Sequence, residues 1–228
     1  MQLNQIHQIE GTIHVVTGLH IGAGKDDIEI GGMDNPIIKN PYSQAPYIPG
    51  SSLKGKMRSQ LELVYFSDRS GVITGGPCDD PETSVCKVFG MPISKSNESA
   101  REKVGPTRIV MRDAILSEKW MEKFKKGELP MEEKNENTID RIKGVALNPR
   151  PMERVPAGVD FDFSMTLKEM EGDNLDSHLE LIWKGMHLIE LDGLGGSVSR
   201  GSGQVSFENI TLNKEPVEFR EFKLWEAA

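Results

Sequence analysis

The chain has 228 residues, of which 37% are hydrophobic and 6% aromatic, and its formal net charge is −8 at pH 7. No run approaches the roughly 18 apolar residues of a membrane span. The acidic total argues against a sequence-blind nucleic-acid binder but does not exclude a locally basic groove. The N-terminus lacks the segments of a signal peptide and the chain has two cysteines, so we expect a cytoplasmic protein with no membrane partner and no disulfide framework.

The first half of the sequence predicts a strand, a helix and an irregular insertion. Residues 11–18 are bounded by glycines and are typical of a strand. A helix is expected to open at Ser51 and Ser52, because a buried stripe follows at helical spacing on Leu53, Met57, Leu61 and Val64. Residues 67–101 are rich in Gly, Pro, Ser and Asp, which indicates an insertion rather than part of the core.

The second half alternates strands and helices around a second insertion. Residues 107–113 predict a strand and residues 117–126 a short helix with Trp120, Met121 and Phe124 on one side. Residues 127–158 are polar and interrupted by prolines, so they predict a projecting hairpin or a long loop. The remaining patterns predict a strand over 159–167, a helix over 173–190 and a last strand over 203–212.

This order of elements predicts an α+β protein with a ferredoxin-like (RRM-like) β-α-β-β-α-β core. We expect a single domain over residues 1–228, with the core at about 6–65, 104–126 and 159–212. The two insertions, about 67–101 and 127–158, are long enough to form lobes of their own.

A glycine-rich loop over residues 193–203 is the most informative segment. Five glycines and three serines, among them Ser199 and Gly201, surround Arg200. Exposed N–H groups, hydroxyls and one guanidinium are suited to holding phosphates. The spacing matches neither the dinucleotide fingerprint nor a phosphate-binding GK[ST] loop, and a flexible surface turn stays open as the alternative.

Asp34 is a candidate catalytic and metal-binding residue. It lies in a turn made by Gly31, Gly32 and Pro36, where an exposed carboxylate can bind a hard divalent cation or act as a general base. The alternative is that Asp34 caps its own turn. No DxD or HExxH partner accompanies it, so the sequence shows no complete metal site.

Several basic residues are candidates for binding an anion. Lys54 and Arg58 lie one turn apart near the start of a helix, where cations oppose the helix dipole unless an anion docks there. His20 precedes a glycine-dotted segment and can contact a phosphate or a ribose. The 127–158 insertion combines Arg141 and Arg154 with apolar residues, a mixture that suits wedging between bases. For each group, a solvated or structural role is the alternative.

Cys78 and Cys86 are the only cysteines. Two thiols supply half of a zinc site, and no further ligands are evident nearby, so we expect free thiols and leave a structural zinc as an open alternative.

Seven segments in this order resemble the RAMP superfamily, and within it the repeated backbone subunit of the type III-A CRISPR interference (Csm) complex. The resemblance covers nearly the whole chain and rests on Gly18-Leu-His-Ile-Gly22, Gly31-Gly-Met-Asp-Asn-Pro36, Tyr47-Ile-Pro-Gly-Ser-Ser-Leu-Lys-Gly-Lys-Met-Arg58, Cys86-Lys-Val-Phe-Gly90, Glu136-Asn-Thr-Ile-Asp-Arg141, Arg154-Val-Pro-Ala-Gly158 and the Gly193–Gly203 loop.

The resemblance implies that several copies line up in a filament along one CRISPR guide RNA, together with other subunits of the complex. The ferredoxin-like core would be the palm, residues 67–101 a lid or finger, and residues 127–158 a thumb that displaces a nucleotide of the complementary target RNA. Asp34 would support cleavage there with Mg²⁺ or Mn²⁺, leaving a 2′,3′-cyclic phosphate. Guide contacts would involve Lys54, Arg58, the glycine loop with Arg200, and His20.

Three other functions stay open at this point. The chain can be a guide-binding scaffold that does not cut, although Asp34 in its full motif argues against this. It can be a guide-processing endonuclease of the same superfamily, which would not polymerise on RNA. A metabolic enzyme that binds a nucleotide at the glycine loop lacks a catalytic constellation.

Overall fold

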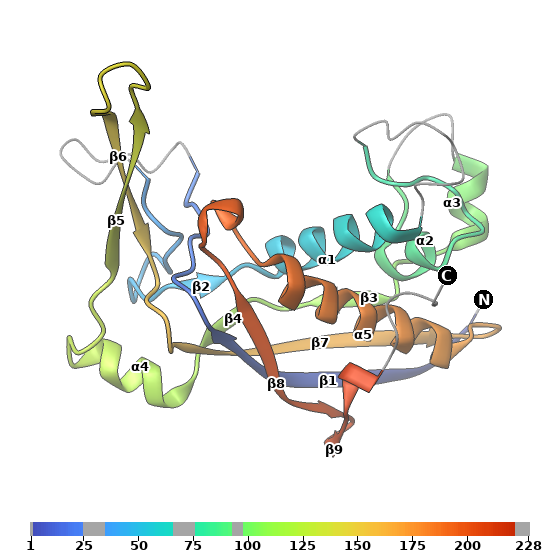
Figure 1. The fold of residues 1–228 in the computed structure, drawn as a ribbon. Helices are drawn as coiled ribbons and strands as arrows, with labels where there is room; N and C mark the ends of the chain where they lie inside the picture. The colour runs from blue at the N-terminus through green and yellow to red at the C-terminus, as the bar shows by residue number, and fades with distance from the viewer. Residues whose placement is uncertain (1, 25–34, 66–75, 93–97, 222–228) are drawn as a thin grey trace.

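An antiparallel sheet forms the centre of the protein (Figure 1). The computed structural model describes residues 2–24, 35–65, 76–92 and 98–221. Strand β1 (Leu3–Val15) lies between β7 (Asp160–Met170) and β8 (Val205–Leu212) and pairs antiparallel with both. Beyond β7 lie β3 (Ile109–Met111) and β4 (Ala114–Leu116), and the path ends at β2 (Tyr47–Ile48) and β9 (Glu215–Pro216). The order β4–β7–β1–β8 is that of a ferredoxin-like sheet, as the sequence predicts.

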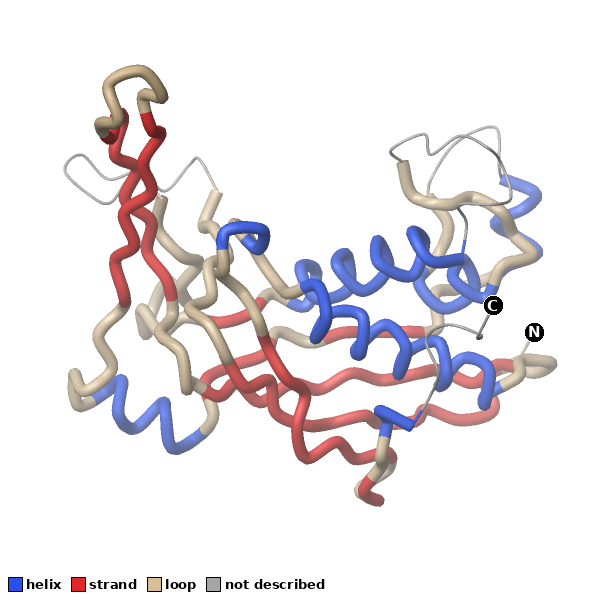
Figure 2. The backbone as a smooth tube through the Cα atoms, in the orientation of Figure 1, coloured by secondary structure: helices blue, strands red, loops and turns tan. Residues whose placement is uncertain are grey.

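Two helices, α1 (Gly50–Tyr65) and α5 (Leu175–Asp192), lie on one face of this sheet, as Figures 1 and 2 show. Period-two alternation explains which residues they cover: Phe161 and Phe163 are buried, whereas Asp160 and Asp162 lie on the opposite face. The Phe163 ring packs edge-on against Phe207 of β8 with 5.5 Å between centroids. We call the sheet with these two helices the palm.

The short helix expected over 117–126 is confirmed as α4 (Glu118–Lys125). Its side chains Trp120, Met121 and Phe124 pack against the core, as the pattern predicts.

The second insertion contains a hairpin of β5 (Glu132–Ile139) and β6 (Ala146–Arg154), which form a two-stranded sheet of their own. Pro149 and Pro151 lie within β6, and a strand with a free edge tolerates the missing N–H donors. Figure 1 shows the hairpin rising from one end of the palm, opposite the end that carries α2 and α3.

Three expectations about the elements are wrong in detail. Strand β1 begins at Leu3 rather than near residue 11, because its polar N-terminal half pairs with β7 and buries His7, whose Nε2 lies 2.9 Å from Glu169 Oε2. The strand expected over 107–113 is divided into β3 and β4, and Asp113 between them accepts a 2.8 Å hydrogen bond from Gly50 N at the start of α1.

The first insertion is also less irregular than expected. Helix α2 (Ser84–Phe89) lies within it, and α3 (Glu98–Val104) begins at its C-terminal end. The Thr83 hydroxyl caps α2 by accepting from Cys86 N, and Val85, Cys86, Val88 and Phe89 are buried. This burial stabilises a helix that is too short for its periodicity to stand out in the sequence.

Candidate nucleic-acid interface

The base of the hairpin is the place where the candidate segments meet. Leu19, just after β1, exchanges backbone hydrogen bonds of 2.9 and 2.8 Å with Val155, just after β6. Gly203 N, at the end of the glycine loop, donates to Gly18 O at 3.0 Å. Segments far apart in the sequence are therefore held against one another by backbone hydrogen bonds.

The glycines of the loop serve first to let the chain pack closely on itself. A Cβ at Gly195 would lie 2.3 Å from His20 O, and one at Gly203 would lie 2.0 Å from Leu194 O. Both glycines have positive φ. Gly201 also has positive φ, at 84°, but a Cβ there would meet no atom within 4 Å. The loop is thus tight on its inner side and open at Gly201.

Ser199 and Arg200, in the short helix η2 (Val198–Arg200), are exposed on this open side. Arg200 Nε lies 2.6 Å from Glu136 Oε2 of β5, and Arg200 Nη2 donates to Ser197 Oγ at 2.6 Å. Its carbonyl accepts a 2.8 Å hydrogen bond from Lys134 Nζ. The hydrogen bond from Arg200 lowers the pKa of Glu136, so this carboxylate stays ionised beside the loop.

His20 is half-buried and oriented by the hairpin. Its Nδ1 donates a 2.7 Å hydrogen bond to Glu153 O in β6. This bond fixes the proton on Nδ1 and leaves Nε2 as an acceptor in the neutral ring.

Glu153 joins the hairpin to the segment that follows Asp34. Its carboxylate accepts from Ile37 N at 3.1 Å and from Lys39 Nζ at 2.6 Å, and its backbone N donates to Asn35 O at 3.0 Å. Asn35 also donates through Nδ2 to Pro151 O at 3.4 Å. Asp34 itself lies outside the described residues. Asn35, the residue after Asp34, is hydrogen-bonded to β6 at the base of the hairpin.

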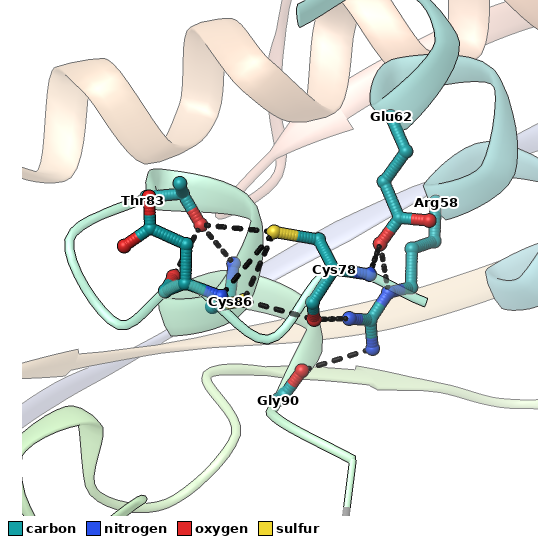
Figure 3. A network of polar contacts seen from close by, with 7 residues as sticks. Arg58, Glu62, Cys78, Thr83, Cys86 and Gly90 are labelled. Atoms are coloured by element: carbon teal, nitrogen blue, oxygen red, sulfur yellow. Dashed lines mark hydrogen bonds and ion pairs between the residues drawn. The ribbon is translucent and has the colours of Figure 1, made fainter. Parts of the chain in front are cut away.

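Lys54 and Arg58 of α1 have different surroundings. Lys54 is half-buried, and burial, helped by the charge of Arg58, lowers its pKa. Arg58 donates from Nε to Glu62, from Nη1 to Gly90 O and from Nη2 to Cys78 O, at 2.7, 2.9 and 2.9 Å (Figure 3). The Arg58 guanidinium therefore binds protein acceptors that hold the first insertion onto α1.

Arg141 and Arg154 lie at opposite ends of the hairpin. Arg141 is exposed in the turn at the tip, near Ile142, which is 97% exposed. Arg154 is 9% exposed at the base and pairs with Glu132 and Ser202. The expected RNA contact suits the position of Arg141, whereas the structure buries Arg154 among protein partners.

The two cysteines lie close together beside Arg58, with 3.8 Å between their sulfur atoms (Figure 3). Burial raises the pKa of Cys86 to about 11, which keeps it a thiol. Within the described ranges, no group of three or more His, Cys, Asp and Glu side chains is arranged to hold a metal ion. The described structure thus offers no third ligand for zinc.

Sequence reasoning missed the acidic and basic partners in the hairpin, namely Glu132, Lys134, Glu136 and Glu153. The first three alternate along β5 and so share one face of the strand. This period-two pattern was visible in the sequence, but the partners of these three side chains, 22 to 66 residues away, were not.

The chain matches known proteins along most of its length. The model of the RAMP superfamily matches residues 12–206. A Methanothermobacter thermautotrophicus protein named "CRISPR system Cms endoribonuclease Csm3" is 42% identical, covering 96% of this chain and 90% of that protein. A protein of the same name from Streptococcus thermophilus is 40% identical, with coverage of 87% and 85%.

A solved structure also resembles this one over almost the whole chain. It is a crystal structure of the Csm3–Csm4 subcomplex of the type III-A CRISPR-Cas interference complex. The TM-score is 0.59 at 28% identity, and the likeness covers 98% of this chain and 86% of that one. Among the helices that the structure describes, none is long and apolar enough to cross a bilayer.

Proposed function

The chain belongs to the RAMP superfamily, and on that premise we propose that it is the repeated backbone subunit of a type III-A CRISPR effector complex. It binds the guide RNA and cleaves complementary target RNA. The proposal takes its reaction from the endoribonuclease names of the relatives, which match this chain at about 40% identity over most of their length. It takes the other subunits as partners from the type III-A complex named for the similar structure. The guide RNA and further copies of the chain are proposed from the resemblance of the sequence motifs to the backbone subunit.

One observation supports the proposed site above all others. The residue after Asp34, the His20 ring and the glycine loop all meet at the base of one hairpin. An RNA strand lying across this junction would contact Arg200, Ser199 and Gly201 on the loop, His20 beside it and Lys54 on α1. We propose these contacts, and Arg141 at the tip, as the RNA interface. Arg58 and Arg154 are left out because their side chains are only 16% and 11% exposed and bind protein acceptors, whereas the Arg200 side chain is 59% exposed.

The cleavage step follows from RNA chemistry. A hairpin that displaces one target nucleotide breaks the stacking there, and the neighbouring ribose can then bring its 2′-oxygen in line with the phosphorus. The 2′-O–P bond forms and the P–O5′ bond breaks, so the 2′-hydroxyl loses a proton and the O5′ gains one. The products are a 2′,3′-cyclic phosphate and a 5′-hydroxyl. DNA has no 2′-oxygen and is not cut.

We propose Asp34 as the residue that supports this step, either as a general base or as an oxygen ligand of Mg²⁺ or Mn²⁺. A bound divalent cation supplies positive charge where negative charge develops on the phosphate. Asp34 would be the protein's own contribution to such a site, and RNA phosphate and water would complete it.

The test is cleavage of a labelled complementary RNA by complexes assembled with the wild type, Asp34→Ala or Asp79→Ala. Asp79 is exposed in the first insertion and serves as the matched carboxylate control. We expect regularly spaced cuts with the wild type and Asp79→Ala in magnesium. With Asp34→Ala, with EDTA, or with deoxyribose at the cut position, we expect the rate to fall by at least about a hundredfold.

Two results would point to the other functions. Undiminished cutting by Asp34→Ala would leave this chain as a guide-binding scaffold and assign the nuclease to a partner subunit. Cleavage of precursor guide RNA by a chain that does not polymerise on RNA would identify a processing enzyme.

A further inference from the structure

Arg154 is the last residue of β6 and is buried where the hairpin meets the palm. It is 9% exposed, whereas residues 146–150, farther out on the same strand, are all exposed. The sequence predicts an RNA contact for it, and a phosphate contact needs a guanidinium that reaches the surface. Its burial therefore calls for a different role.

One guanidinium joins three segments of the chain. Arg154 Nη1 donates to Ser202 Oγ of the glycine loop at 3.1 Å, and Nη2 forms an ion pair with Glu132, the first residue of β5. Ser202 is 2% exposed. Arg154 Nε is buried and has no acceptor among the described residues. Burial of this charge is costly, so the two pairings have to compensate for it.

Gly18 completes the contact from the palm. A Cβ at this position would lie 2.7 Å from Arg154 Nε and 2.7 Å from Glu132 Oε2. The Arg154–Glu132 pair therefore packs directly on the backbone of Gly18, three residues after the end of β1. We call Gly18, Glu132, Arg154 and Ser202 the clamp.

A second set of contacts lies one step farther out on the same face of β5. Lys134 and Glu136 follow Glu132 at alternate positions, and both bind Arg200 of the glycine loop. The hairpin is thus held against the glycine loop at two successive levels. Arg154 belongs to the inner, buried level.

We infer that Arg154 is a positioning residue, which fixes the angle of the hairpin on the palm and thereby the place and rate of target-RNA cleavage. This inference rests on the proposed function. From Arg154 to the far end of β6, the strand spans nine residues, a lever of about 25 Å. A rotation of about 10° at the clamp would move the far end by about 4 Å, and misplacement by about 1 Å can slow a reaction a hundredfold.

The experiment compares complexes that carry Arg154→Met, Arg154→Lys, Gly18→Ala or the double variant Gly18→Ala/Arg154→Met, each bound to the same guide RNA. Arg101→Met is the matched control, since Arg101 lies on α3 at the opposite end of the molecule (Figure 1). The single-turnover rate and the position of every cut are measured, with guide-RNA affinity and melting temperature in parallel.

For Arg154→Met we expect a cleavage rate about tenfold lower and cuts spread over neighbouring positions, with guide affinity within about twofold of the wild type. Gly18→Ala should act in the same direction. The effects of Gly18→Ala and Arg154→Met should be less than additive in the double variant, because the guanidinium is gone and Glu132, the other group that the new Cβ would meet, has lost the partner that holds it there. Arg154→Lys should not restore the rate, because a compact ammonium does not reproduce the planar fork with which the guanidinium reaches Ser202 and Glu132.

Four outcomes would overturn the inference. The first is an Arg154→Met variant that matches the wild type in rate and cut positions. Recovery with Arg154→Lys, or loss of guide affinity in step with the rate, would identify Arg154 as an RNA contact. Additive effects of Gly18→Ala and Arg154→Met would show that the two residues do not act together. Asp34→Ala in the same assay separates failure of this inference from failure of the proposed function. If the proposed function is wrong, Asp34→Ala cuts like the wild type.

Discussion

His178 in α5 is a buried residue whose ionisation is set by its surroundings. It is 4% exposed, and burial lowers its pKa; Asp173 opposes this shift, while Arg108 and Lys87 add to it. Arg108 binds Asp173 through both carboxylate oxygens, at 2.9 and 3.0 Å. His178 is therefore neutral in the folded protein at pH 7.

Because the pKa of His178 is lowered by folding, the free energy of unfolding should decrease as the pH falls. In the unfolded chain the pKa of His178 is about 6.5. As the pH falls through this value, the unfolded chain binds a proton that the folded chain does not bind, so the free energy of unfolding decreases. The decrease ends once the pH passes below the lowered pKa of the folded state. Urea denaturation between about pH 5 and pH 7 should show this loss, and His178→Gln should flatten it. A difference between the two proteins that does not vary with pH would contradict this assignment.

At the scale of the helices, α1 and α5 meet at Gly185. A Cβ there would lie 2.4 Å from Met57 Cγ and 3.1 Å from Leu61 Cδ1, both in buried side chains of α1. Gly185→Ala should therefore lower the free energy of unfolding by about 1–3 kcal/mol, although alanine alone favours a helix.

Gly55 in α1 provides the matched control. It is exposed, and a Cβ there would meet no atom within 4 Å, so Gly55→Ala should raise the free energy of unfolding by about 0.5–1 kcal/mol. Urea denaturation of the two variants measures both effects. If Gly185→Ala instead raised the free energy of unfolding, α1 and α5 could move apart at Gly185 with little loss of packing energy, which would contradict the prediction.

The elements also show what the sequence can and cannot predict. Strand β7 and helix α5 were predictable because each repeats one period over many buried residues. The ferredoxin-like order followed from their succession. Helix α2 was missed because six residues carry too little periodicity. The clamp was not predictable, because Arg154 meets Gly18, Glu132 and Ser202 only once the chain has folded. RNA contacts at His20, Lys54 and Arg200 stay predictions.

For the whole molecule, the net charge of −8 confines RNA binding to places where cations gather locally. Several acidic residues lie on the face of the sheet turned away from α1 and α5: Glu10, Asp160, Asp162 and Glu208. Lys54 belongs to α1 on the other face, and Lys134 and Arg200 meet where the hairpin and glycine loop touch. Guide RNA would meet only a few cations on this side.

A shallow salt dependence follows from this distribution. Each phosphate neutralised on a single strand contributes about 0.7 to the slope of log K against log salt concentration. Lys54→Gln and Arg200→Gln should each weaken guide-RNA binding and reduce the slope by about 0.7, as measured by fluorescence anisotropy of a labelled guide. Lys168→Gln, on β7 opposite Ile6 and outside the proposed interface, should leave the slope unchanged. If only the Lys168 variant changed the slope, RNA would lie on the face of the sheet turned away from α1 and α5. The base of the hairpin would then not be the guide-binding site.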